Sequence, residues 1–151
     1  MVAVTVATMA AADAAFALLA SFFEEEGFHT TAADLRRNLE AFLVDESCWV
    51  ALAWLDGRAV GLATASTARS TEDGLLAEMQ DLYVLPEARR AGVARALVDA
   101  ALDWSRKRGC GGMEVVLTPE GEAAHSLSDF YAKLGFEATG RTIHAHRLGQ
   151  A

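Results

Sequence analysis

Cysteine is scarce in this chain of 151 residues, and its scarcity argues against two kinds of site. The two cysteines are Cys48 and Cys110, and neither has a histidine near it at the spacing of metal ligands. They indicate neither a disulfide framework nor a zinc site. His144 and His146 share one face of a predicted strand without an acid or cysteine beside them, so we expect no metal. We expect both cysteines to be small buried side chains in a reduced, cytoplasmic protein.

Long hydrophobic runs and a surplus of basic residues are missing as well. No apolar stretch approaches the roughly 20 residues that span a bilayer, and the apolar N-terminus alternates and lacks a basic start, which predicts a strand rather than a signal peptide. Acidic residues outnumber basic ones 21 to 13, for a net charge of −8. This balance argues against sequence-independent nucleic-acid binding, which needs a concentrated basic face to neutralise phosphates. We expect no membrane or nucleic-acid partner; a cationic partner suits the charge, although acidity also serves solubility.

The first half of the chain alternates clear strand and helix patterns. A content of 52% hydrophobic and 23% charged residues suits one soluble domain over residues 1–151. Residues 2–7 predict a strand, and the spacing over residues 10–26 predicts a helix that Gly27 stops. Thr31 is positioned to cap a second helix that ends near Asp45. Two strands, 48–55 and 59–67, flank the turn Asp56-Gly57, and a third runs over 75–85 until Pro86 ends it.

The second half predicts a parallel connection followed by shorter elements. Residues 92–108 form a helical pattern that closes at Gly109, and residues 113–118 form a strand pattern. A loop with Pro119 and Gly121 precedes a helix through Tyr131, and Phe136 and residues 143–147 predict final strands. Consecutive strands favour an antiparallel meander, whereas the unit over residues 75–118 is long enough for a parallel crossover. The fold class is therefore α/β or α+β with a mixed sheet.

The turn within "VLPEARRAGVARALV", residues 84–98, joins an apolar strand to an apolar helix. The first residues of a helix offer unpaired N–H groups and the positive end of the helix dipole, which together attract anions. Gly92 permits a close approach, and Arg89, Arg90 and Arg95 supply cations suited to phosphate oxygens. The alternative is that these arginines are solvated and that the glycine only shapes the connection.

Two motifs resemble those of the GNAT N-acetyltransferase superfamily. Residues 89–94 are similar to its Gln/Arg-x-x-Gly-x-Gly/Ala signature, and "DFYAKLGFEATG", residues 129–140, resembles its second signature. The resemblance implies a mostly antiparallel central sheet of about seven strands flanked by about four helices.

The resemblance also implies a cofactor, acetyl-CoA or another acyl-CoA. Its pyrophosphate would lie on the backbone of the turn, and its pantetheine arm would run along the strand before it. The implied contacts are Leu82, Tyr83, Val84, Arg89, Arg90, Ala91, Gly92, Val93, Ala94 and Arg95. Many members carry an asparagine several residues before the tyrosine of the second signature, whereas Ala124 stands near that position here. Ser126 or His125 is the replacement contact that we expect.

Acyl transfer to an amine requires a base, an N–H donor and an acid. Tyr131 matches the family tyrosine that protonates the CoA thiolate; the alternative is a core aromatic. Glu78 lies where some members carry a catalytic base; the alternative is a solvated or ion-paired strand charge, and Asp81 competes for the role. Strict alternation places Glu78 and Val84 on one face of the strand and Asp81 on the other. The N–H of Val84 would stabilise the oxyanion.

The acceptor is expected to bind at the joint between the first two helices. Glu25 and Phe28 in that joint could receive a cationic amine through charge and an aromatic face, with Asp81 as a further contact, or the acids could form a solvated helix end. Three functions remain open: an N-acetyltransferase for a small primary amine, an acyl-CoA-binding sensor without turnover, and a protein lysine or N-terminal acetyltransferase. A free edge among the last strands makes a homodimer an expectation.

Overall fold

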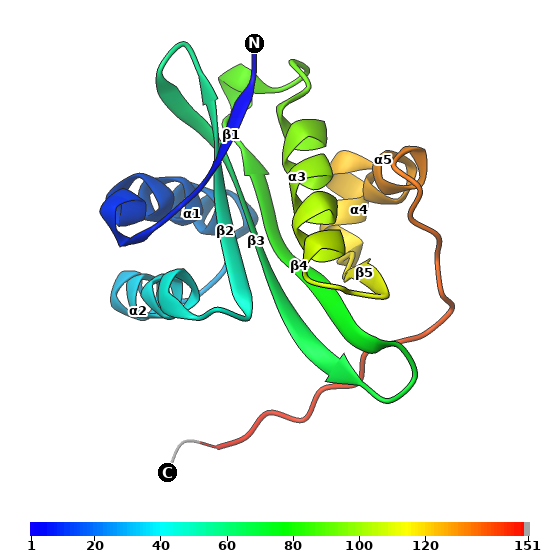
Figure 1. The fold of residues 1–151 in the computed structure, drawn as a ribbon. Coiled ribbons are helices and arrows are strands. Elements are labelled where there is room, and N and C mark those ends of the chain that lie inside the picture. Colours follow the sequence, from blue (N-terminus) through cyan, green and yellow to red (C-terminus); the bar gives the residue numbers. More distant parts are fainter. Residues whose placement is uncertain (150–151) are drawn as a thin grey trace. The chain divides into compact units, whose positions relative to one another are not determined.

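A five-stranded sheet forms the centre of the fold in the computed structural model, which describes residues 1–149. The strand order is β1-β2-β3-β4-β5, and Figure 1 shows the strands running side by side. Four strands form an antiparallel meander, and the fifth pairs parallel with the fourth. The strands are β1 (Ala3–Val6), β2 (Cys48–Leu55), β3 (Arg58–Ser70), β4 (Gly74–Val84) and β5 (Gly112–Val115). The mixed, mostly antiparallel sheet is confirmed.

The expectation of about seven strands is corrected to five within residues 1–149. The predicted strands at Phe136 and residues 143–147 do not form, and no helix or strand is present over 134–149. Alternation alone does not make a strand, because a strand also requires a partner for its backbone groups. These predicted strands therefore provide no free edge, and the edge strands of the sheet over residues 1–149 are β1 and β5.

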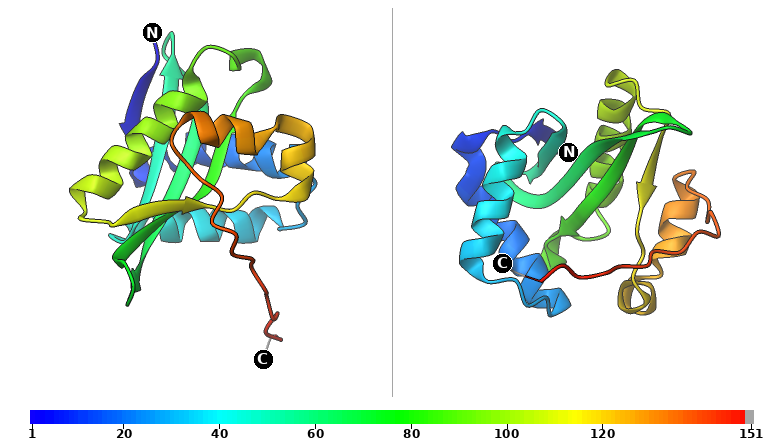
Figure 2. Two further views of the ribbon diagram at one scale, coloured as in Figure 1. Left: turned by 90° about the vertical axis from the view of Figure 1, so that its right-hand side faces the viewer. Right: turned by 90° about the horizontal axis from the view of Figure 1, so that it is seen from below.

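Three helices cover the two faces of the sheet in the unit Met1–Val116. Helices α1 (Ala12–Glu26) and α2 (Ala32–Val44) lie on one face, and α3 (Val93–Lys107) lies on the other (Figures 1 and 2). The two predicted helix signals between α1 and α2 are confirmed: Gly27 ends α1 with φ 73°, and the Thr31 hydroxyl accepts from the Asp34 N–H at 3.1 Å. Among residues 1–149 no helix combines the length and apolarity that crossing a bilayer requires.

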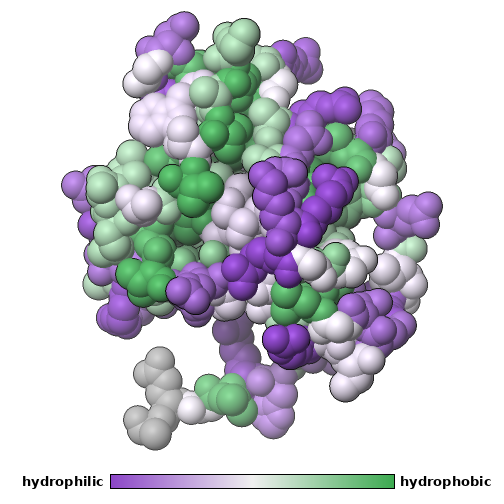
Figure 3. Space-filling view, viewed as in Figure 1, coloured by the Kyte–Doolittle hydropathy of each residue, from purple (hydrophilic) through white to green (hydrophobic). Residues whose placement is uncertain are grey.

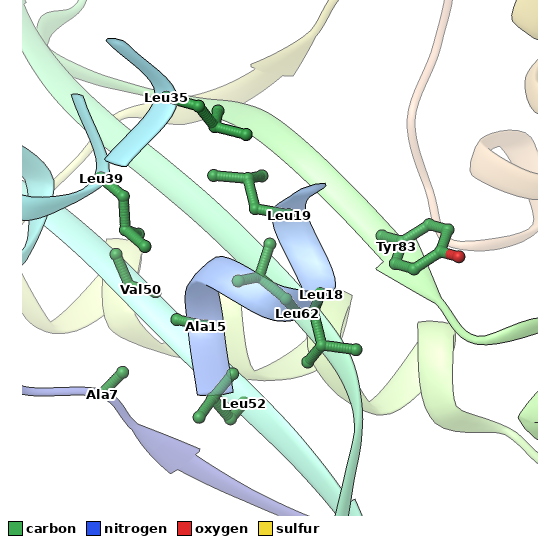
Figure 4. Close-up of a cluster of buried hydrophobic side chains, with 10 residues drawn as sticks. All are labelled: Ala7, Ala15, Leu18, Leu19, Leu35, Leu39, Val50, Leu52, Leu62 and Tyr83. Carbon is green, nitrogen blue, oxygen red and sulfur yellow. The ribbon is translucent and has the colours of Figure 1, made fainter. Parts of the chain in front are cut away.

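The main core lies between α1, α2 and the sheet (Figure 4). Leu52 and Leu62 come from the sheet and have no exposed surface, and Leu19 and Leu39 pack on them from the helices. The ring of Tyr83 closes one edge of this cluster, and Figure 4 shows its hydroxyl pointing away from the leucines. Each such buried leucine contributes about 1.5–3 kcal/mol to the stability of the fold.

Helix α3 packs very closely on the opposite face. A Cβ at Gly61 of β3 would lie 2.9 Å from the Val93 side chain and 3.2 Å from the Tyr83 carbonyl oxygen. Trp104 of α3 stacks on Trp49 of β2 with 5.8 Å between ring centroids. The outer side of α3 carries charged residues, and Figure 3 shows a hydrophilic band there. Gly61 therefore fixes how closely the first turn of α3 approaches the sheet.

The second unit begins at Leu117 and contains two short helices. These are α4 (Pro119–His125) and α5 (Leu127–Lys133), so the described residues hold five α-helices rather than about four. The sequence predicts a loop for α4, and this prediction is wrong. The Thr118 hydroxyl accepts from the Gly121 N–H at 3.0 Å, and Pro119 takes the first helical position, which it tolerates because its missing N–H is not needed there.

Candidate active site

The turn between β4 and α3 has the geometry of an anion site. After Val84 a 3₁₀ turn, η2 (Pro86–Ala88), leads into residues 89–92, where Arg90 has φ 66° and Gly92 has φ 79°. Gly92 caps α3 without any side-chain hydrogen bond, and the first turn of α3 contains no acid. The N–H groups of the first helical residues therefore point outward without an intrahelical acceptor. A Cβ at Gly92 would meet nothing within 4 Å, so its left-handed conformation, not crowding, favours glycine.

The three arginines of the turn differ in what they contact. The Arg89 Nε donates to the Val84 carbonyl at 3.0 Å, and its Nη2 pairs with Glu25 at 2.7 Å. Arg90 is exposed, and Arg95 makes only a distant pair with Asp99 at 3.8 Å, where both side chains are exposed. Arg89 thus braces the turn, while Arg90 and Arg95 border the start of α3. A direct phosphate contact by any of them stays a prediction.

Glu25 connects the end of α1 to β4. Besides Arg89, its carboxylate accepts from the Tyr83 hydroxyl at 3.0 Å. Burial, and then the hydrogen bond to Glu25, raise the pKa of Tyr83. Phe28 is 46% exposed and packs edge-on against Phe23 with 4.9 Å between centroids. In this structure the Glu25 carboxylate is bound to Tyr83 and Arg89. The acceptor roles of Glu25 and Phe28 remain predictions.

A β-bulge in β4 changes which side chains share a face. Asp81 pairs with Thr64 and Met79 pairs with Ala65, so Gln80 is an extra residue without a direct partner. Glu78 pairs with Ser66, two positions from Thr64, and paired residues of antiparallel strands project from the same face. Glu78 therefore lies on the same face as Asp81, and the predicted separation of the two acids is wrong.

This shared face is the one that α1 and α2 cover. Val50 of β2 pairs with Thr64 and belongs to the core cluster beneath these helices. The Gln80 amide donates to the Ser66 hydroxyl at 3.1 Å, which holds the bulge on that side. Glu78 is half-buried there. Both candidate bases thus face the side of the sheet on which the acceptor is expected.

Asp81 lies in a small cavity within the first unit. The cavity has a volume of about 80 Å³, and its polar lining consists of Asn38, Thr64 and Asp81. The Thr64 hydroxyl donates to the Asp81 carboxylate at 2.5 Å. Burial raises the pKa of Asp81, and the hydrogen bond from Thr64 partly offsets this. Thr64 is not among the site residues predicted from the sequence, although a threonine within the small apolar run Gly61–Ala65 indicates a buried polar side chain.

Strand β5 pairs with only part of β4. The parallel ladder joins Leu76–Met79 to Gly112–Val115, which is the whole of β5, whereas β4 continues to Val84. Leu82 and Val84, which we expect to contact the pantetheine arm, lie on the part of β4 past this ladder. The edge of β4 beyond Met79 therefore makes no ladder hydrogen bonds with β5.

Tyr131 and Ser126 belong to the second unit. The Tyr131 ring is 7% exposed and packs edge-on against Phe130 and Phe136, with 5.0 and 5.2 Å between centroids. Burial raises the pKa of Tyr131 to about 12. Ser126 joins α4 to α5 with φ 49° and is exposed. Over residues 1–149, no three His, Cys, Asp or Glu side chains are arranged to hold a metal ion.

The chain is similar to known acetyltransferases. The model of the acetyltransferase (GNAT) family matches residues 12–136. An aminoglycoside N(6')-acetyltransferase type 1 of Salmonella typhimurium is 32% identical over 96 residues, which are 61% of this chain and 64% of that protein. The match thus spans less than two thirds of that relative's length. A second protein of that name, from Klebsiella aerogenes, is 47% identical over 58 residues, or 36% of this chain and 38% of its own.

Solved structures share the fold at low identity. The structure of AAC(6')-Iy in complex with a CoA-S-monomethyl-acetylneamine bisubstrate analogue superposes with a TM-score of 0.80 at 24% identity, over 99% of each chain. A ribosomal-protein-alanine N-acetyltransferase of Brucella melitensis gives a TM-score of 0.79 at 21% identity, over 99% of this chain and 100% of its own. At these identities the likenesses show a shared fold over 99% of this chain. The chain belongs to the GNAT acetyltransferase family.

Proposed function

We propose that this protein is an acetyl-CoA-dependent N-acetyltransferase that transfers an acetyl group directly to the primary amine of a small molecule. The start of α3 is the observation that carries the proposal. Arg90 and Gly92 adopt left-handed conformations just before this helix, and no side chain caps its N-terminus. The first turn of the helix contains Arg95 and no acid. Such a cradle fits a pyrophosphate, because backbone N–H groups and the helix dipole both favour negative charge. The relationship to named N-acetyltransferases supports the proposal.

When bound, acetyl-CoA would supply the acetyl group as a thioester, and CoA would leave as the free thiol. Residues 90–95 would hold its pyrophosphate, and the backbone of Leu82–Val84, past the β4–β5 ladder, would border the pantetheine arm. Ser126 would be a further contact in place of the family asparagine. The Val84 N–H would donate to the carbonyl oxygen of the reacting acyl group, as an oxyanion donor does.

Tyr131 and Glu78 are the side chains that we propose to move protons. In the reaction the amine nitrogen forms a bond to the acetyl carbon, the carbon–sulfur bond breaks, and the sulfur receives a proton. With a pKa of about 12, Tyr131 keeps its proton at neutral pH and can serve as the acid. Glu78, on the face of β4 below α1 and α2, would take the proton that the amine loses, directly or through water.

A transfer assay tests the proposal. The protein is incubated with acetyl-CoA and a panel of primary amines, the products are identified by mass spectrometry, and release of free CoA thiol is followed. Acetylated amine is expected with wild type and strongly reduced product with Tyr131→Phe. Binding of acetyl-CoA by calorimetry without acetylation of any amine would favour a non-catalytic acyl-CoA-binding module instead. The homodimer expected from the sequence stays a prediction, which sedimentation would check.

A further inference from the structure

The cavity at Asp81 has a polar floor and apolar walls. Its floor comes from the sheet, where Thr64 of β3 is 2% exposed and Asp81 of β4 lies beside it. Its walls come from helices α1 and α2, and Asn38 of α2 is exposed and therefore lies at the rim. The wall residues are Leu19, Phe23, Leu35, Leu39 and Phe42. The cavity is thus a small, mostly apolar pocket that contains one carboxyl group.

That carboxyl group has a hydrogen-bond donor but no cation. Thr64 donates one hydrogen bond to it, and the ion pairs found over residues 1–149 do not include Asp81. None of the cavity-lining residues is basic. A carboxylate removed from water is stable only with a compensating partner. Burial accordingly raises the pKa of Asp81, and an ammonium group entering the cavity would supply the missing charge.

The size and polarity of the cavity limit what can accompany an ammonium group. A volume of about 80 Å³ has room for roughly five to eight water-sized groups. One nitrogen and about five methylene or methyl carbons fill that space, and the aliphatic and aromatic walls suit carbon. A hydroxylated sugar would bury hydroxyl groups against Leu19, Leu35 and Leu39, which offer them no hydrogen-bond partner.

We propose that this cavity binds an unbranched primary alkylammonium, with the nitrogen on the Asp81 carboxylate and the carbon chain between α1 and α2. The inference rests on the proposed function only where it identifies the bound amine as the acetyl acceptor. It narrows the acceptor class to small apolar amines and excludes polyhydroxylated amino sugars from this cavity. Thr64 positions the Asp81 carboxylate, and Asn38 lies where the ligand enters.

Isothermal titration at neutral pH, without acetyl-CoA, tests the site on the intact protein. Three probes separate charge from shape: pentan-1-amine, which is protonated because its pKa is about 10 like that of lysine, pentan-1-ol and glucosamine. Wild type is expected to bind pentan-1-amine at least about tenfold more tightly than either of the others, a difference that one buried charge pair readily supplies. Equal binding of pentan-1-ol, or no binding of pentan-1-amine, would overturn the proposal.

Two variants and a control locate the binding. Asp81→Asn keeps the shape of the side chain and is expected to weaken pentan-1-amine at least about tenfold, and Thr64→Val to weaken it about threefold. The control Asp103→Asn makes the same chemical change on α3, on the opposite side of the sheet, where Asp103 pairs with Lys107, and should bind as wild type does. Unchanged binding by a folded Asp81→Asn protein would refute the site; if that variant does not fold, Thr64→Val and the three probes decide.

The outcome also separates this site from the proposed function. Binding of pentan-1-amine with no acetylation of it by acetyl-CoA would leave the cavity assigned and count against acetyl transfer to this class of amine. Acetylation of other amines by a protein that does not bind pentan-1-amine would overturn the cavity assignment and leave the N-acetyltransferase activity in place.

Discussion

Replacing Gly92 by aspartate and by asparagine tests whether the start of α3 holds the pyrophosphate of acetyl-CoA. Both side chains have the same shape, and both are among those that tolerate the left-handed conformation, φ 79°, that this position adopts. No atom lies within 4 Å of a Cβ placed there. Both variants should therefore fold, each losing about 1 kcal/mol of stability from the backbone conformation alone.

The two variants should differ in the binding of acetyl-CoA, because only aspartate adds negative charge. A carboxylate about 6 Å from a phosphate oxygen is repelled by about 3 kcal/mol at an effective dielectric constant of about 20. The turn is exposed, so solvent reduces this to about 1–2 kcal/mol. Calorimetry should accordingly show Gly92→Asp binding acetyl-CoA about 5- to 30-fold more weakly than Gly92→Asn. Added salt should narrow the gap, because it screens exposed charges.

Urea unfolding of the same two proteins is the control. Equal unfolding free energies with unequal affinities would assign the effect to charge at the anion site. Equal affinities for the two variants would refute the reasoning, since the charge at the helix start would then not meet the ligand.

Three further perturbations test other parts of the molecule. Tyr131→Phe should lower kcat about 10²-fold. Because burial raises the folded-state pKa of Tyr131 from 10.0 to about 12, wild type should also lose about 2–3 kcal/mol of unfolding free energy relative to this variant as pH rises from about 10 to about 12; parallel profiles would contradict that burial. Gly61→Ala brings a Cβ to 2.9 Å from α3 and should destabilise by about 1–3 kcal/mol in urea unfolding, whereas Gly112→Ala, whose nearest atom is at 3.6 Å, should have little effect. Glu25→Gln removes a pair with Arg89 that is about one third exposed and should reduce the unfolding free energy by less than about 1 kcal/mol; a thermal melt that shows a much larger loss would mean that the pair does more than brace the turn.

The elements that the sequence predicted correctly are those with local signals. Gly27 and Thr31 mark a helix end and a helix start through their own backbone and side-chain chemistry, and Asp56-Gly57 forms the hairpin turn through its left-handed conformations. The acid-free helical turn after Gly92 is also evident in the sequence, whereas the left-handed conformation of Gly92, φ 79°, is a finding of the structure. Helix α4 has local signals too, a cap at Thr118 and a first-turn proline at Pro119, although proline and glycine so close together are also typical of a loop.

Tertiary pairing is what the sequence alone did not supply. The alternating pattern of residues 143–147 resembles that of a strand, yet whether it pairs depends on a partner elsewhere in the chain. The sequence likewise leaves Glu25 as either a contact of the acceptor amine or an acid of a solvated helix end. In the structure its carboxylate accepts hydrogen bonds from Tyr83 and Arg89, which lie far from it in the sequence, at the start of the turn before α3.

The bulge at Gln80 has the largest consequence for function. Period-two alternation places Glu78 and Asp81 on opposite faces, so that only one of them could face the acceptor. The extra residue at Gln80 shifts the alternation by one position. Residues of β4 before the bulge therefore point to the opposite face from the one that strict alternation with the residues after it predicts. Both acids then lie on the side of α1 and α2, and only Asp81 lines the cavity. With two acids on one face, one can bind the ammonium group while the other accepts its proton. A carboxylate that binds an ammonium ion tightly also holds the proton on the nitrogen, whereas acetyl transfer requires that proton to leave. Under the proposed function, separate positions for binding, at Asp81, and for proton removal, at Glu78, would resolve that conflict.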